Sequence, residues 1–351
     1  MKNNLIQSTG DVKPLQLSKQ EFDGLTKRKK SSQVVAFTFE KTELPDKYKI
    51  AQRMRLCGKT LVYAENPTGG EPILVSAMRC GIRLCPSCSW IRAHMVFQNV
   101  YSIVTDRSFL KKQFIFLTLT VKNCKGENLE KEINRLLSAW QKLTDNKRQP
   151  FRKSFLGTFR AMEITYNPIL KNYHPHIHAM AAVEPGYFRK SNENYLSQAQ
   201  LRELWRDACG LDYLPQCRIE KVKNAKYKQV AEVAKYTVKT ADYLNRPTVL
   251  ETLHTALKGK RLIAYGGLFK TAKAKLCLPN EDDMGELPKV TVEELLRNPY
   301  IRKIVLEWDM GRYHFSPLQP SADLAEWLEP GRVIAEILRS QADAFRGQGG
   351  V

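Results

Sequence analysis

The most constraining stretch of this chain is YHPHIHAM, residues 173–180, in which every second residue from 174 to 178 is a histidine. The whole chain of 351 residues has only six histidines, so composition does not account for this alternation. In a β-strand, residues i, i+2 and i+4 point to the same face. His174, His176 and His178 would therefore share one face, while the apolar residues between them pack into a core. The segment predicts a strand with an imidazole face and an apolar face.

Imidazoles that converge from one rigid strand favour a metal site, because histidine is the commonest metal-binding side chain. The preceding predicted strand carries Glu163 between two apolar residues, and a hairpin would bring this carboxylate to the histidines. Two imidazoles and one carboxylate suit Mg²⁺ or Mn²⁺ and leave coordination positions open. We predict a divalent-cation site of His176, His178 and Glu163. His174 is the alternative third ligand, a group that supports a ligand, or a group near the substrate.

Cysteine spacing predicts a second metal site. The segment CGIRLCPSCSW contains a Cys-Pro-x-Cys turn, and a further Cys-Gly pair precedes it in the chain. Four thiolates are a full ligand set for structural Zn²⁺. The predicted ligands are Cys57, Cys80, Cys85 and Cys88, with His94 as a possible substitute. The other cysteines (124, 209, 217 and 277) are scattered and are expected to be core or surface thiols.

The charge of the chain predicts a polyanionic partner. Lys and Arg total 56 against 36 Asp and Glu, a formal net charge of +20. An excess of this sign favours nucleic acid through phosphate contacts. No apolar run approaches the roughly 20 residues of a membrane helix. The first residues lack the apolar core of a secretory signal, so we expect a cytoplasmic protein without a membrane partner.

The order of predicted elements favours an α+β fold, an antiparallel sheet with helices packed on one face. Apolar patterns predict strands at 111–121, 156–167, the histidine segment and 217–222, and helices at 129–145, 198–209 and 226–244. Gly210 is expected to end the second of these helices.

The motifs and the family that they resemble divide the chain into four predicted regions. These are a basic, flexible arm at 1–45, a zinc-binding module at 46–100, a catalytic domain at 101–285, and a C-terminal extension at 286–351. The extension is expected to contain amphipathic helices and one strand, and to serve DNA recognition or oligomerisation.

The predicted helix at 226–244 offers a nucleophile. Glu232, Tyr236 and Lys239 are spaced to share one helical face, and apolar residues lie largely on the other. A neighbouring lysine favours phenolate and stabilises phosphate charge, so Tyr236 is a candidate for covalent catalysis. On its own this pattern is weak, because Glu–Lys pairs usually only solvate a helix.

Together these segments resemble the replication initiators of small rolling-circle plasmids, within the HUH endonucleases. That class is named for two histidines around a hydrophobic residue, here His176-Ile177-His178. The matching segments follow in order over about 50–285: RLCG, CGIRLCPSCSWIRA, FLTLTV, E…HPHIH, AEVAKYTVK and RLIAYGGLFK.

The resemblance implies an HUH-type sheet and a specific chemistry. The two histidines and an acidic partner would hold a divalent cation, and Tyr236 would attack the scissile phosphate. The products would be a 5′-phosphotyrosine and a 3′-OH primer. Glu232 would activate water in the terminating cleavage, and Lys239 would orient the phosphate.

The partners implied are origin DNA, nicked as a single strand, and a host helicase and polymerase. A second copy in a homodimer is a further candidate partner. An HUH transposase or a mobilisation relaxase would share this chemistry. A non-catalytic zinc-containing DNA-binding regulator would explain the charge and the cysteines, but would leave the histidine strand without a role.

Overall fold

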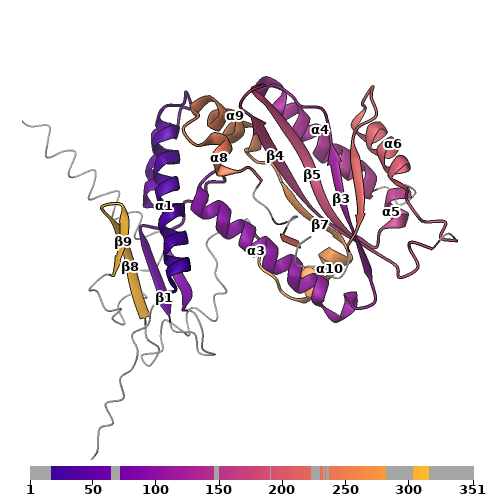
Figure 1. Cartoon of the computed structure of the whole chain (residues 1–351), viewed down its shortest axis with the longest axis horizontal. Coiled ribbons are helices and arrows are strands. Elements are labelled where there is room, and N and C mark those ends of the chain that lie inside the picture. The colour runs from indigo at the N-terminus through magenta and orange to yellow at the C-terminus, as the bar shows by residue number, and fades with distance from the viewer. Residues whose placement is uncertain are drawn as a thin grey trace, which may run out of the picture. The chain divides into compact units, whose positions relative to one another are not determined.

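Two antiparallel sheets organise the part of the chain that the structure describes (Figure 1). The computed structural model describes residues 17–64, 72–145, 150–189, 191–222, 230–231, 234, 237–281 and 303–315. The chain divides into two units, one made of residues 1–30, 55–79 and 286–351, and the other of 31–54 and 80–285. Antiparallel sheets with helices packed on them confirm the predicted α+β class.

The first unit is built on a four-stranded sheet in the order β2-β1-β8-β9. Its strands are β1 (Thr60–Ala64), β2 (Ile73–Ala77), β8 (Lys303–Asp309) and β9 (Arg312–Phe315). Leu61, Tyr63, Leu306 and Tyr313 form a buried cluster on it. Since Leu61 lies opposite Leu306, residues far apart in the sequence share this sheet. Residues 303–315 therefore pair with the region predicted as a zinc module, and the other residues after 281 lie outside the described part.

Part of the predicted flexible arm is a helix. α1 spans Lys19–Glu40, and two of its apolar side chains, Phe22 and Leu25, pack against the cluster of the four-stranded sheet. Further along α1, Val35 and Phe39 are fully buried. The prediction of flexibility was wrong for this stretch, because the basic run KRKK at 27–30 hid apolar residues at helical spacing.

The second unit holds a five-stranded sheet in the order β6-β3-β5-β4-β7. Its strands are β3 (Gln113–Thr120), β4 (Gly157–Asn167), β5 (Asn172–Val183), β6 (Cys217–Lys221) and β7 (Ile263–Gly267). β4 and β5 form the predicted hairpin, paired from Gly157 with Ala182 to Asn167 with Asn172. β5 lies at the centre of the sheet, between β3 and β4, which gives the histidine segment a rigid support.

Helices cover both faces of this sheet, not one as predicted. α3 (Pro86–Thr105) and α10 (Leu268–Lys275) bury residues in one cluster with Phe116 and Met180. α4 (Gly126–Asp145) contacts β5 and is drawn on the opposite side of the sheet in Figure 1. Ile177, whose side chain points away from that of Met180, is also fully buried. The central strands are nearly continuous apolar runs, which require cover on both sides.

The remaining helices are short or peripheral. They are α2 (Lys47–Leu56), η1 (Arg107–Phe109), α5 (Pro150–Ser154), α6 (Gln198–Cys209), α8 (Thr240–Tyr243) and α9 (Pro247–Leu257). α6 begins with a capping box at Ser197. It ends, as predicted, at Gly210, which is in the left-handed conformation. Among the described helices, none combines the length and the apolar character needed to cross a membrane.

The prediction of one continuous helix at 226–244 was wrong at residues 237–239, where the helix is interrupted. Thr237 and Val238 form bends, Lys239 is extended, and α8 begins only at Thr240. The carbonyl of Thr237 accepts a hydrogen bond from the Ile164 amide at 2.7 Å. This carbonyl therefore pairs with the edge of β4 and not within a helical turn. Glu232 and Tyr236 lie outside the described residues.

Candidate functional site

The register of the β4–β5 hairpin brings the predicted metal ligands together. Glu163 pairs with His176, and the neighbouring pairs on the same face are Ala161 with His178 and Thr165 with His174. Same-face pairs recur at every second residue, so the carboxylate and the imidazoles project from one side of the sheet. The other side buries Ile177 completely.

Three ligand atoms converge at this point. The Nε2 atoms of His176 and His178 are 3.1 Å apart. Glu163 Oε2 lies 3.1 Å from His178 Nε2 and 3.4 Å from His176 Nε2. Ligands held about 2.1 Å from one ion at right angles would lie about 3 Å from one another. The donor set and its spacing therefore fit a divalent cation.

The outer nitrogens of the two histidines are also engaged. His176 Nδ1 lies 3.1 Å from the carbonyl oxygen of His174, which can only accept a hydrogen bond. A proton on Nδ1 of His176 would satisfy this carbonyl and would leave the Nε2 lone pair for a cation. His178 Nδ1 lies 3.4 Å from the hydroxyl of Thr118 on β3. Such contacts orient imidazoles that bind metals.

Glu163 is held in its ionised form. Burial alone would raise its pKa, but the hydrogen bonds and charges of His176 and His178 lower the pKa well below the ordinary range. Its side chain is 10% exposed, as is that of His176, and that of His178 is 12% exposed. A buried carboxylate with imidazole partners is suited to share a cation with them.

His174 does not join this group. Glu163, His176 and His178 each offer a ligand atom within 4.8 Å of the others, and among the described residues His174 is not one of this set. Its ring centroid lies 5.1 Å from that of His176. Its Nδ1 is buried without a hydrogen-bond partner. Of the two candidates for third ligand, the structure brings Glu163 to the histidine pair.

The segment that contains the predicted nucleophile reaches the same strand. The Thr237 carbonyl binds the amide of Ile164, the residue next to Glu163. Lys239 is exposed at the start of α8. A small pocket nearby is lined by Arg83, Arg92 and Thr237, which gives it a basic wall.

The four predicted zinc ligands also come together. Each of their thiols offers a sulfur, and all four sulfurs lie within 4.8 Å of one another in a buried cluster. The cluster is Cys57, Cys80, Cys85 and Cys88. His94, the predicted substitute, stacks on Trp90 instead. Four convergent thiols fit a tetrahedral Zn²⁺.

Local backbone explains how the cysteines are aimed. Cys57 and Cys80 each precede a glycine in the left-handed region, with φ of +65° at Gly58 and +67° at Gly81. Cys85 is the N-cap of α3 and precedes a proline at its first turn. The Cys-Gly and Cys-Pro pairs in the sequence thus correspond to turns that present sulfur atoms.

The other described cysteines behave as ordinary thiols. Burial raises the pKa of Cys209 and that of Cys217 to about 12, and raises the pKa of Cys124 to about 11. Cys277 is exposed. The thiols of Cys124, Cys209 and Cys217 therefore stay protonated near neutral pH.

Comparison with known proteins identifies the family. A family model described as "Replication protein" matches residues 72–316. A "Protein rep" of Lentilactobacillus hilgardii is 34% identical over 284 residues, which cover 76% of this chain and 88% of that protein. The chain belongs to the replication protein family. A "Protein rep" of Bacillus amyloliquefaciens is 34% identical over 70% of this chain and 78% of its own length. No solved structure matches the chain.

Membership in the replication protein family confirms the resemblance to plasmid replication initiators. The family match includes the Glu163–His176–His178 group, and also three of the four clustered cysteines. A further "Protein rep", from Streptococcus pneumoniae, is 31% identical over 78% of this chain.

Sequence reasoning missed two contributors to the site of this replication protein. Thr118, the neighbour of His178, was read only as part of an apolar strand. The signal was present, because Thr118 and Thr120 alternate with leucines and mark the face shared with the histidines. Asn123, after β3, lies near His174 in a pocket, and no local pattern marks it.

Proposed function

We propose that this protein initiates plasmid rolling-circle replication by nicking one strand of origin DNA, with Tyr236 as the nucleophile. The observation that carries the proposal is the convergence of Glu163, His176 and His178 on a sheet whose β4 edge binds Thr237. The residue after the predicted tyrosine is thus bonded beside the metal-binding group. Membership in the replication protein family supports the biological role.

The reaction is a transesterification. The phenolic oxygen of Tyr236 attacks the scissile phosphorus, a P–O bond to the tyrosine forms, and the bond to the 3′ oxygen breaks. The phenol proton leaves to solvent and the 3′ oxygen takes one up, which gives a 5′-phosphotyrosine and a 3′-OH primer. Lys239 orients the phosphate, and Glu232 activates water in the terminating cleavage.

Two metals belong to the proposal. Glu163, His176 and His178 would hold Mg²⁺ or Mn²⁺, and the clustered cysteines would hold a structural Zn²⁺. The divalent cation, when bound, supplies a Lewis acid that polarises the phosphate. The chain's own residues position the phosphate, donate the nucleophile and activate water.

Partners follow from the reaction. The net charge of +20 favours a DNA strand as substrate. A primer with a free 3′-OH requires a polymerase, and displacement of the old strand requires a helicase, so both are expected from the host. A homodimer and a cytoplasmic location complete the proposal.

The covalent intermediate provides the decisive test. We expect the wild-type protein, incubated with Mn²⁺ and single-stranded origin DNA, to form a DNA adduct that denaturing gels resolve. Tyr236→Phe should abolish the adduct, and Tyr48→Phe, a change at an exposed tyrosine, should retain it. An adduct that persists in Tyr236→Phe would refute the assignment of the nucleophile.

The terminating step is tested separately. Glu232→Ala should still form the adduct but should fail to release it by water. Loss of the first cleavage in Glu232→Ala would move this carboxylate to the first step. Complete absence of an adduct in the wild type would favour a non-catalytic DNA-binding regulator.

A further inference from the structure

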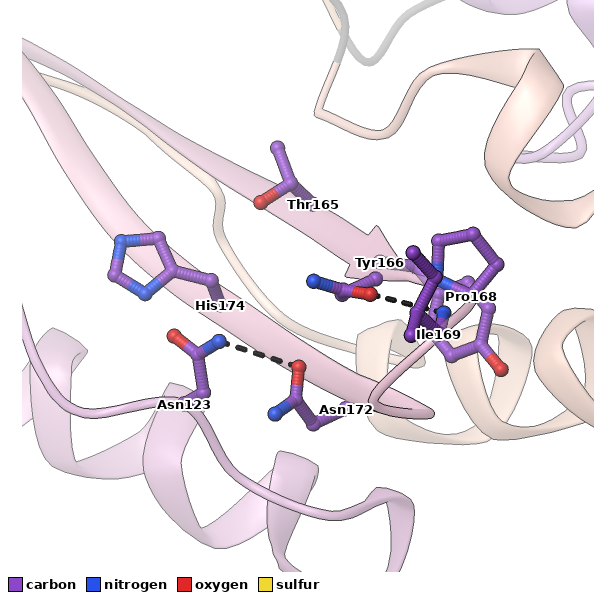
Figure 2. A pocket seen from close by; sticks show the side chains of 8 residues that line it. Asn123, Thr165, Tyr166, Pro168, Ile169, Asn172 and His174 are labelled. Atoms are coloured by element: carbon purple, nitrogen blue, oxygen red, sulfur yellow. Dashed lines mark hydrogen bonds between the residues drawn. The ribbon is translucent and has the colours of Figure 1, made fainter.

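The hairpin face that carries the metal-binding group continues into a pocket of about 590 Å³ (Figure 2). Beyond Glu163 and His176, the next pair on this face is Thr165 with His174, and the last is Asn167 with Asn172. All four of these residues line the pocket. The polar face of the hairpin therefore extends past the ligands toward the turn.

The pocket offers hydrogen-bonding groups of both kinds. Asn123 Nδ2 donates to Asn172 Oδ1 at 3.2 Å. This bond uses one hydrogen and one lone pair, so the Asn123 carbonyl and the Asn172 amide hydrogens retain capacity for a ligand. Beside them His174 carries a buried Nδ1 without a hydrogen-bond partner. Buried polar atoms of this kind commonly form a hydrogen bond with a ligand or with water.

The opposite wall is apolar and exposed. Pro168 and Ile169 line the pocket, and Ile169 is 88% exposed. The turn that carries them is fixed, because Asn167 Oδ1 accepts hydrogen bonds from the amides of Ile169 and Leu170 at 2.9 and 3.0 Å. A planar ligand with an apolar face and a polar edge matches these two walls. An unpaired nucleobase has both features.

The spacing along the strand places such a base beside the metal-binding group. Successive same-face residues of a strand are about 6.8 Å apart, so His174 is one such step from His176. A step of this length is comparable to one nucleotide of an extended single strand. A base in the pocket would thus belong to the nucleotide next to a phosphate held at Glu163, His176 and His178.

We propose that this pocket binds the unpaired base of the nucleotide next to the scissile phosphate, and that Asn123, Asn172 and His174 select it. The proposal rests on the proposed nicking function. It assigns His174 to DNA recognition instead of metal binding. It also explains the third histidine on a face that needs only two for the cation.

Metal-free binding separates recognition from cleavage. Without added Mg²⁺ or Mn²⁺, we would measure the binding of labelled eight-nucleotide oligomers of deoxyadenosine, deoxycytidine, thymidine or abasic residues by the full-length protein. We expect the wild type to prefer one base over the others by about tenfold, the scale of a good amide–base pairing. Asn123→Ala and Asn172→Ala should reduce this preference to within about twofold. Asn194→Ala, at an exposed asparagine in another loop, should keep it.

A second variant tests the apolar wall without a risk to folding. The Ile169 side chain is exposed. Ile169→Asp should weaken binding of the base-containing oligomers more than it weakens binding of the abasic oligomer. Wild-type base preference in all three pocket variants, with unchanged unfolding midpoints, would overturn the proposal. If the wild type still forms its covalent adduct in that case, only the pocket assignment fails. A wild type that binds no single strand would remove both proposals.

Discussion

The two groups of potential metal ligands in this chain differ in exposure. The sulfurs of the cysteine cluster belong to residues that are at most 3% exposed. By the same measure Glu163 and His176 are 8% exposed, and His178 is only partly buried. Four thiols complete a tetrahedral site, whereas three ligands leave positions for water or substrate. Burial and ligand number thus support our proposal of a structural role for the cysteine cluster and a catalytic role for the carboxylate–histidine group.

The two groups also differ in how the chain assembles them. Three of the four cysteines fall within nine residues, 80–88, and are aimed by local turns. Glu163 and His176 are joined only by the register of β4 and β5. A shift of one residue in that register would move the carboxylate to the opposite face. The convergence of the cysteines depends mainly on turns, and that of the carboxylate–histidine group depends on strand pairing.

The largest expected effect is on the cysteine cluster. Cys88→Ser should reduce bound zinc from about one per chain to near zero, because it removes a ligand from a closed site. Structural zinc contributes on the order of 10 kcal/mol in small zinc modules, so we expect a large fall in the unfolding midpoint. Metal analysis by mass spectrometry and thermal unfolding check this. Cys277→Ser, at an exposed cysteine, is the control, and equal zinc in both variants would contradict a closed site.

The second-largest effect is expected when a ligand of the carboxylate–histidine group is removed, which should lower activity but retain the fold. His178→Ala removes one of three ligands, and we expect adduct formation to fall by about a hundredfold or more, as when a preorganised electrostatic group is lost. The unfolding midpoint should change little, because the His178 side chain is partly exposed. His94→Ala, at an exposed histidine outside both groups, should nick normally. A collapse of the midpoint in His178→Ala would give this group a structural role.

A second buried carboxylate, Glu281, has a lysine as its cationic partner and can be compared with Glu163. Glu281 accepts hydrogen bonds from Asn99 at 2.6 Å, from Lys273 at 2.7 Å, and from Tyr265. Burial raises its pKa, but these partners outweigh burial and hold the pKa below the ordinary value of 4.5. We expect Glu281→Gln to lower the free energy of unfolding at pH 7 by about 2 kcal/mol.

The sign of its pH dependence follows from linkage. Because the folded pKa of Glu281 is lowered, the unfolded chain takes up the proton first as the pH falls. The stabilisation is complete above pH 4.5 and declines below it, so the gap between wild type and Glu281→Gln should narrow at pH 4. Urea unfolding at pH 7, 5 and 4 measures it. Mn²⁺ should leave this difference in the free energy of unfolding unchanged. A difference that grows in acid would refute the lowered pKa of Glu281.

The smallest effect on activity is expected from Thr118, whose hydroxyl lies beside the ligand His178. Thr118→Val keeps the shape of the side chain but removes the hydroxyl 3.4 Å from His178 Nδ1. Loss of such a contact typically weakens metal binding by about tenfold. A titration of nicking against Mn²⁺ should shift by that factor and reach the same maximum. Thr105→Val, at an exposed threonine of α3, should not shift it.

Local patterns carried much of the prediction. Alternating histidines in an apolar strand, a helical rhythm at 129–145 and Gly210 at the end of α6 each specify an element through neighbours in sequence. Prediction failed where distant contacts decide. Thr237 bonds to the edge of β4 and interrupts a helix that local spacing favoured. The basic start of α1 was read as flexible because its packing partners lie in β1, β8 and β9.

The sequence by itself determined which side chains could serve the chemistry. Strand alternation put His174, His176 and His178 on one face, and the cysteine spacing named a ligand set, since both follow from backbone geometry over a few residues. Only the tertiary structure decided that Glu163 joins the pair and that His174 faces a pocket with Asn123. Those outcomes depend on the register between strands and on the chain that follows β3, which long-range packing sets and local sequence does not encode.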